Sequence, residues 1–185
     1  MGEAPVQHAM RKLAARLDEL GIPYALVGAM ALNEYGYRRV TVDVDVLMTP
    51  EGLKQFKAVW LGRGYLEKFP GSRGLRDTEL GVTIDVLMTG DYPGDGKPKP
   101  VRFPDPAKVA IREGGLSLIP LAKLVELKLA SGMSTIHRAK DIGDVVELIK
   151  VANLSRELAN DLDASVRSRY LEIWDELQTP IPFQE

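Results

Sequence analysis

The sequence has no cysteine and only two histidines, His8 and His137, among its 185 residues. Without cysteine there is no disulfide framework, and this lack is consistent with a reducing compartment. A zinc site or another soft-metal site depends on cysteine and histidine ligands, so such a site is not expected.

Long apolar runs and an excess of one charge are also missing. No segment approaches the roughly 18 apolar residues that a membrane span needs. The N-terminal segment is charged and contains proline, which is unlike a signal peptide. The 24 basic and 26 acidic residues nearly cancel, so the composition gives no reason to expect a broad nucleic-acid surface. We therefore expect a soluble, cytoplasmic protein.

The segment from Arg39 to Met48 alternates polar and apolar residues almost strictly. Because side chains alternate between the two faces of a strand, the pattern predicts that Arg39, Asp43 and Asp45 share one face. Aspartate is unfavourable inside strands, and such a conflict with local propensity often marks function. The alternative is the solvated face of an ordinary half-buried strand, which is the more frequent origin of an isolated pair of this kind.

A second segment, residues 82–88, repeats this pattern and places Asp85 in the same phase. If the two strands are neighbours in one sheet, Asp85 lies beside Asp43 and Asp45, and the apolar residues line the opposite, buried face. Three clustered carboxylates repel each other unless a cation lies between them. Mg²⁺ is the expected ion, because it prefers oxygen ligands and is often held by carboxylates together with substrate phosphates.

The remaining periodicity predicts an α+β fold, in which a small mixed sheet with helices packed on it is followed by a C-terminal helical lobe. Residues 89–106 carry Lys97, Lys99 and Arg102 without periodicity, and are either a basic flap near a phosphate-bearing substrate or a solvated connection. Helices are expected over residues 10–20, 30–35, 50–62 and 164–177, after Pro120, and after Asp141 as a cap. Strands are expected over residues 24–27, 39–48, 65–69 and 82–88, and residues 116–119 are a short apolar stretch that precedes the C-terminal helices.

Four features occur together in the first half of the chain: Gly28-Ala29 after a strand, a short helix closed by Gly36, Arg39-x-Thr41-x-Asp43-x-Asp45, and the later carboxylate of Asp85. This combination resembles the nucleotidyltransferase superfamily, which has a polymerase-beta-like fold. Residues 124–130 and 138–145 look like the helical motif of the AbiEii-type group, whose members include toxins of toxin–antitoxin systems. The resemblance covers about residues 20–150.

This resemblance implies a catalytic core over residues 1–119, a helical lobe over residues 120–185, and an NTP as co-substrate. It assigns Asp43 and Asp45 as ligands of Mg²⁺, with two ions expected, and Asp85 as a third ligand or general base. Two such ions can stabilise the attacking and the leaving oxygen of an in-line displacement, so positioning and charge neutralisation supply most of the catalysis.

The resemblance also implies nucleotide contacts from Gly28, Ala29, Arg39 and Lys128. Gly28 would let a phosphate approach the backbone at the start of a helix. The family often has Gly-Gly or Gly-Ser at this place, so Ala29 leaves only backbone donors there. Two alternatives stay open: Arg39 is equally well explained by a salt bridge that holds the carboxylates in place, and Lys128 by the solvated edge of a helix.

The activity that the resemblance implies is Mg²⁺-dependent transfer of a nucleoside monophosphate from an NTP to a hydroxyl, with release of pyrophosphate. The acceptor is an RNA, with tRNA as one candidate, a protein or a small molecule. If the protein is the toxin of a toxin–antitoxin system, an antitoxin protein is its partner. An antibiotic-modifying nucleotidyltransferase would share this chemistry and differ only in its acceptor. The alternative is a non-catalytic protein of this fold that binds a nucleotide or a protein partner, which Ala29 favours.

Overall fold

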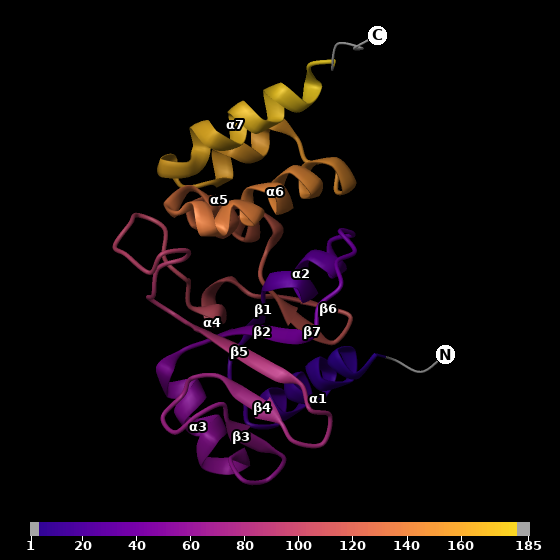
Figure 1. The fold of residues 1–185 in the computed structure, drawn as a ribbon, viewed down its shortest axis with the longest axis vertical. Helices are drawn as coiled ribbons and strands as arrows, with labels where there is room; N and C mark the ends of the chain where they lie inside the picture. The colour runs from indigo at the N-terminus through magenta and orange to yellow at the C-terminus, as the bar shows by residue number, and fades with distance from the viewer. Residues whose placement is uncertain (1–3, 181–185) are drawn as a thin grey trace. The chain divides into compact units, whose positions relative to one another are not determined.

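In the computed structural model, residues 4–180 are described, and they form two compact units. The sheet unit comprises residues 4–34, 38–91 and 103–120. The helical unit comprises residues 35–37, 92–102 and 121–180. Figure 1 follows the chain through both units, each of which is described by itself below.

The sheet unit contains one mixed sheet with the strand order β3-β4-β5-β2-β1-β7-β6. The pairs β2–β5 and β1–β7 are parallel, and the other neighbouring pairs are antiparallel. This open mixed sheet confirms the predicted α+β fold class. The strands are β1 (Ala25–Leu26), β2 (Asp43–Met48), β3 (Tyr65–Glu67), β4 (Leu75–Asp77), β5 (Thr83–Met88), β6 (Ile111–Glu113) and β7 (Leu116–Leu118).

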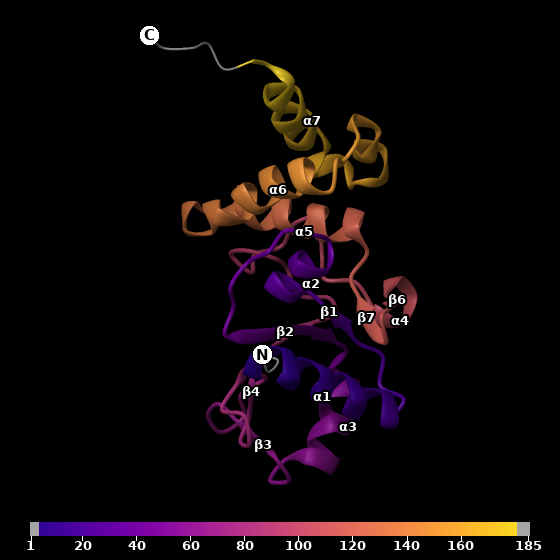
Figure 2. The same cartoon turned by 90° about the vertical axis from the view of Figure 1, so that its right-hand side faces the viewer.

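Four helices accompany this sheet, and Figure 2 shows the first two on opposite sides of β2. The third begins where the sequence predicts: Pro50 is its first residue, and the Gly52 N–H donates to the hydroxyl of Thr49 at 3.0 Å. Val27, which follows β1, continues the pairing of β1 with β2, because its N–H donates to the Asp45 carbonyl at 3.1 Å. The four are α1 (Pro5–Glu19), α2 (Gly28–Glu34), α3 (Pro50–Trp60) and α4 (Pro106–Val109).

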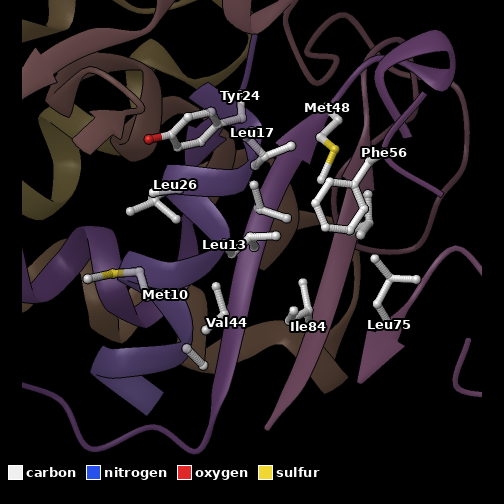
Figure 3. Close-up of a cluster of buried hydrophobic side chains, with 14 of the residues drawn as sticks. Met10, Leu13, Leu17, Tyr24, Leu26, Val44, Met48, Phe56, Leu75 and Ile84 are labelled. Carbon is white, nitrogen blue, oxygen red and sulfur yellow. The ribbon is translucent and has the colours of Figure 1, made fainter. Parts of the chain in front are cut away.

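The hydrophobic core of this unit lies between the sheet and helices α1 and α3 (Figure 3). Phe56 of α3 packs edge-on against Tyr65 of β3, with ring centroids 5.1 Å apart. Every second residue of β2 and β5 faces this core, as the alternation predicts: Val44, Val46, Met48, Ile84, Val86 and Met88. Burying one such large side chain stabilises the fold by about 1.5–3 kcal/mol. The fully buried members include Met10, Leu13, Leu17, Leu26, Val44, Met48, Leu75 and Ile84.

The predicted strand over residues 39–48 begins only at Asp43, so the first part of that prediction is wrong. Val40 and Val42 are 95% and 72% exposed, and no strand lies against them. The backbone of Arg39 is instead held by the Asn33 side chain, which accepts from its N–H at 2.6 Å and donates to its carbonyl at 3.1 Å. Because side chains take up the backbone hydrogen bonds of this segment, they compete with strand pairing.

The helical unit contains α5 (Leu121–Ser134), α6 (Ala139–Val151) and α7 (Ala164–Gln178), with 3-10 turns over Ile136–Arg138 and Arg156–Asp161. The three helices confirm the helices predicted in this part of the sequence. Asp141, however, is not a cap: Arg138 holds that position, and Asp141 lies buried inside the first turn of α6. Within residues 4–180, no helix combines the length and the apolar character that crossing a membrane requires.

The loop over residues 92–102 belongs to the helical unit and is tied down by its own side chains. The ammonium of Lys99 donates to Asp95 and to the carbonyls of Pro93 and Lys97, at 2.6–2.9 Å. The Asp95 N–H donates to the hydroxyl of Ser134 on α5 at 3.1 Å. Lys99 therefore organises the loop, so this part of the predicted basic flap is neither a free phosphate contact nor a solvated side chain.

Candidate active site

The three predicted carboxylates lie on one face of two neighbouring strands. Strands β2 and β5 are parallel and paired in register, with Asp45 opposite Asp85 and Asp43 opposite Thr83. Because side chains alternate along each strand, all three point away from the buried core. Each of the three residues is half-buried. We call the surface formed by Asp43, Asp45 and Asp85 the carboxylate face.

Gly28, the first residue of α2, lies directly against the carboxylate of Asp45. A Cβ at this position would overlap the carboxylate oxygen Oδ2 and lie 2.6 Å from Cγ of Asp45. The backbone of Gly28 also has a φ of +61°, a conformation that residues with a side chain rarely adopt. Glycine is thus required twice here, by the backbone angle and by the close approach of Asp45.

Lys68 is a residue of this site that the sequence analysis missed. It follows β3, and its ammonium donates to Oδ1 of Asp85 at 2.9 Å. The hydrogen bond to Asp85 raises the pKa of Lys68, and the negative charges of Asp85 and Asp43 raise it further. No periodicity or spacing signals this contact, because it depends on the β3–β4 hairpin folding beside β5.

Two predicted nucleotide contacts lie close to this face in the chain. Ala29 is the second residue of α2 and is half-buried. Arg39 lies outside β2, so the prediction that it shares the strand phase of Asp43 and Asp45 is wrong. The bonds from Asn33 place the backbone of Arg39, rather than the register of the sheet.

Lys128 lies in the helical unit, where it joins α5 to α6. Its ammonium donates to Oδ1 of Asp141 and to Oδ2 of Asp144, both at 2.8 Å. The second oxygen of Asp141 accepts from the Ser131 hydroxyl at 2.6 Å and from Nε of Arg138 at 2.9 Å. We call these five residues the Lys128 network. Lys128 is therefore not the solvated edge of a helix.

The charges in the Lys128 network keep Asp141 ionised. Burial alone would raise the pKa of the Asp141 carboxyl, but the charge of Lys128 and the bonds from Lys128 and Ser131 outweigh it and lower that pKa. The charge of Arg138 acts in the same direction. In place of the cap predicted at Asp141, the structure has a buried ion pair between α5 and α6.

The donor chemistry of the carboxylate face fits a hard divalent cation such as Mg²⁺, since it offers carboxylate oxygens and no nitrogen or sulfur ligand. Among residues 4–180, however, no three acidic or histidine side chains converge closely enough to form a ready metal cage. Asp43 and Asp45 are the pair that would hold the ion. Asp85 would have to release Lys68 before that oxygen could serve as a ligand.

Comparison with known proteins bears on the fold of the chain. No family model matches the sequence, and no curated protein matches it by sequence. Solved structures do match: the chain has the fold of nucleotidyltransferases, and at 15% identity this likeness concerns the fold alone.

Two of these structures are of ANT(2″)-Ia. The crystal structure of its complex with adenylyl-2″-tobramycin has a TM-score of 0.59 and covers 88% of this chain and 97% of that one. The solution structure of the same antibiotic-resistance factor has a TM-score of 0.60, with 95% and 98% covered. A candidate nucleotidyltransferase from Thermotoga maritima is also 15% identical, with a TM-score of 0.53 and coverages of 80% and 96%.

Proposed function

We propose that the protein is a Mg²⁺-dependent nucleotidyltransferase that moves a nucleoside monophosphate from an NTP to a hydroxyl acceptor. The observation that carries this proposal is the carboxylate face, which lies on two parallel neighbouring strands within a nucleotidyltransferase fold. In the proposal, Asp43 and Asp45 hold Mg²⁺, and Asp85 is a third ligand or the general base. The reaction would belong to residues 1–119, with residues 120–185 as a helical lobe.

The chemistry is an in-line displacement at the α-phosphorus of the NTP. The acceptor oxygen forms a bond to this phosphorus, the bond to the bridging oxygen breaks, and pyrophosphate leaves. The acceptor proton passes to the carboxylate of Asp85. When bound, Mg²⁺ supplies charge neutralisation for the phosphate oxygens. Gly28 and Ala29 would offer backbone contacts to the nucleotide, with Arg39 and Lys128 as further candidates.

Label transfer from radioactive NTPs tests the proposal. Asp43→Asn and Asp85→Asn should each lower the transfer rate, the latter by about 10²–10⁴-fold if Asp85 is the general base. Asp91→Asn is the matched control, because Asp91 is an exposed carboxylate after β5 that pairs with Arg73 outside the carboxylate face. Transfer that persists unchanged in both site variants would contradict the assigned roles.

The acceptor is to be identified with the same assay. ANT(2″)-Ia is known in complex with an adenylylated tobramycin, so aminoglycosides are the first small molecules to offer. Total tRNA and purified proteins are the other two acceptor classes. A toxin of the AbiEii type would label tRNA or a protein and would be inhibited by an antitoxin partner, whereas an antibiotic-modifying enzyme would label the aminoglycoside.

A non-catalytic nucleotide-binding protein is the second candidate. Ala29, which lacks a hydroxyl, and Lys68, which occupies Asp85, favour it. Calorimetry with Mg²⁺ and a non-hydrolysable NTP, run beside the transfer assay, separates the two. Nucleotide binding without label transfer to any acceptor supports the non-catalytic protein. Label transfer to an acceptor excludes it.

A further inference from the structure

The side chain of Lys68 is directed onto the carboxylate face by the hairpin that carries it. The Lys68 N–H donates to the carbonyl of Gly74 at 3.0 Å, which extends the pairing of β3 with β4. The side chain then crosses Gly74, where a Cβ would overlap Cδ and lie 3.3 Å from Cγ of Lys68. Its position at Asp85 is thus set by the hairpin backbone.

The ammonium of Lys68 and a divalent cation would use the same carboxylate. Lys68 holds Oδ1 of Asp85 at 2.9 Å, and Asp45 lies opposite Asp85 in the adjoining strand. An ammonium group and a divalent ion bound to the same carboxylate repel each other, because their charges are only partly screened at a protein surface. Lys68 and Asp85 are 41% and 45% exposed, so this bond can open without disturbing the core.

From these contacts we infer that Lys68 is the internal counter-cation of the carboxylate face and competes with a divalent ion for Asp85. The inference rests on the proposed function, since it concerns the site where that reaction would occur. Lys68 is a positioning residue in this scheme. It holds Oδ1 of Asp85 in the metal-free protein and must leave before that oxygen can bind an ion or accept a proton.

The affinity for Mn²⁺ alone, measured by calorimetry without nucleotide, tests the inference. Lys68→Met removes the competing charge and should tighten Mn²⁺ binding by about threefold to tenfold. Lys68→Arg keeps the charge and should stay near the wild-type affinity. Arg73→Met is the matched control, because Arg73 lies on the same hairpin but pairs with Asp91, and it should leave the affinity unchanged.

Thermal unfolding with and without Mn²⁺ supplies a second readout. The Lys68→Met protein should gain more in melting temperature from Mn²⁺ than the wild type does, because tighter binding to the folded state stabilises it more. If Lys68→Met does not fold, Lys68→Gln is measured in its place, because glutamine also removes the charge but keeps a polar side chain.

The possible results separate this inference from the proposed function. If the wild type transfers label but Lys68→Met binds Mn²⁺ no more tightly, the inference fails and the function stands. If no label is transferred but Lys68→Met binds Mn²⁺ more tightly, the function fails and the inference stands. If neither protein binds Mn²⁺ or transfers label, both are overturned.

Discussion

The carboxylate face and the Lys128 network both pair a lysine with aspartates, yet the two differ in exposure and in bonding. Lys68 binds Asp85 through one oxygen, with both side chains more than two-fifths exposed. Lys128 is 13% exposed and Asp141 is fully buried, with both oxygens of Asp141 hydrogen-bonded. An exposed single bond can be exchanged for a ligand at small cost, whereas breaking a buried, fully bonded pair is costly.

Residue types alone therefore do not distinguish an exposed ion pair that can open from a buried structural one. The resemblance assigned Lys128 to the nucleotide, but the bonds of Lys128 join α5 to α6. A phosphate contact by Lys128 would require it to leave two carboxylates. Lys68, which no motif marks, holds its partner on the face where the reaction is proposed.

Removing one carboxylate from each region should have opposite effects on label transfer and on stability. Asp85→Asn should lower label transfer by about 10²–10⁴-fold and change the free energy of unfolding by less than about 0.5 kcal/mol. Asp141→Asn should destabilise the protein by about 3 kcal/mol, because it leaves Lys128 and Arg138 without their shared anion. Denaturant unfolding and the transfer assay measure the two effects. A destabilising Asp85→Asn and a neutral Asp141→Asn would reverse the comparison.

Gly28→Ala should disturb the carboxylate face although it replaces none of the three aspartates. The new Cβ would push Asp45 aside, so we expect divalent-ion affinity to fall by about 10–100-fold. Gly21→Ala is the control: Gly21 has a similar φ of +64°, but nothing lies within 4 Å of its Cβ position. The control carries the backbone strain alone, so equal losses of Mn²⁺ affinity in both variants would refute the role of the close approach.

As the pH is lowered, the stability of the wild type should fall more steeply than that of a variant in which the Lys128 network is broken. The pKa of Asp141 is lowered in the folded protein from its ordinary value of 3.8. Its contribution to stability is therefore complete above about pH 4 and is lost as the pH falls through the lower folded-state value. Unfolding measured from pH 7 down to pH 2.5 should show a steeper decline in the wild type than in Asp141→Asn. Parallel curves would show that Asp141 is not responsible.

The sequence allowed the carboxylate face to be predicted because a period of two sets which side chains share a strand face. It could not indicate where β2 begins, since the backbone bonds of Asn33 to Arg39 compete with strand pairing. The sequence does not indicate Lys68 because its pattern predicts no strand over Leu75–Asp77, and so no hairpin of β3 and β4. It predicts a cap at Asp141 because the burial of this residue depends on α5, which the local pattern does not reveal.

A substitution at Ala29, beside the carboxylate face, should have only a small effect on nucleotide binding. Ala29→Ser introduces the hydroxyl that members of the superfamily this sequence resembles often carry beside the glycine. One added hydrogen bond to a phosphate is worth about 0.5–1.5 kcal/mol, so KM for the NTP should fall by about twofold to tenfold. Ala29→Gly, the other residue common there, adds no donor and is the control. Because Ala29 follows Gly28 at the start of α2, a gain confined to serine would place the phosphate beside Asp45, and equal KM values in all three proteins would place it elsewhere.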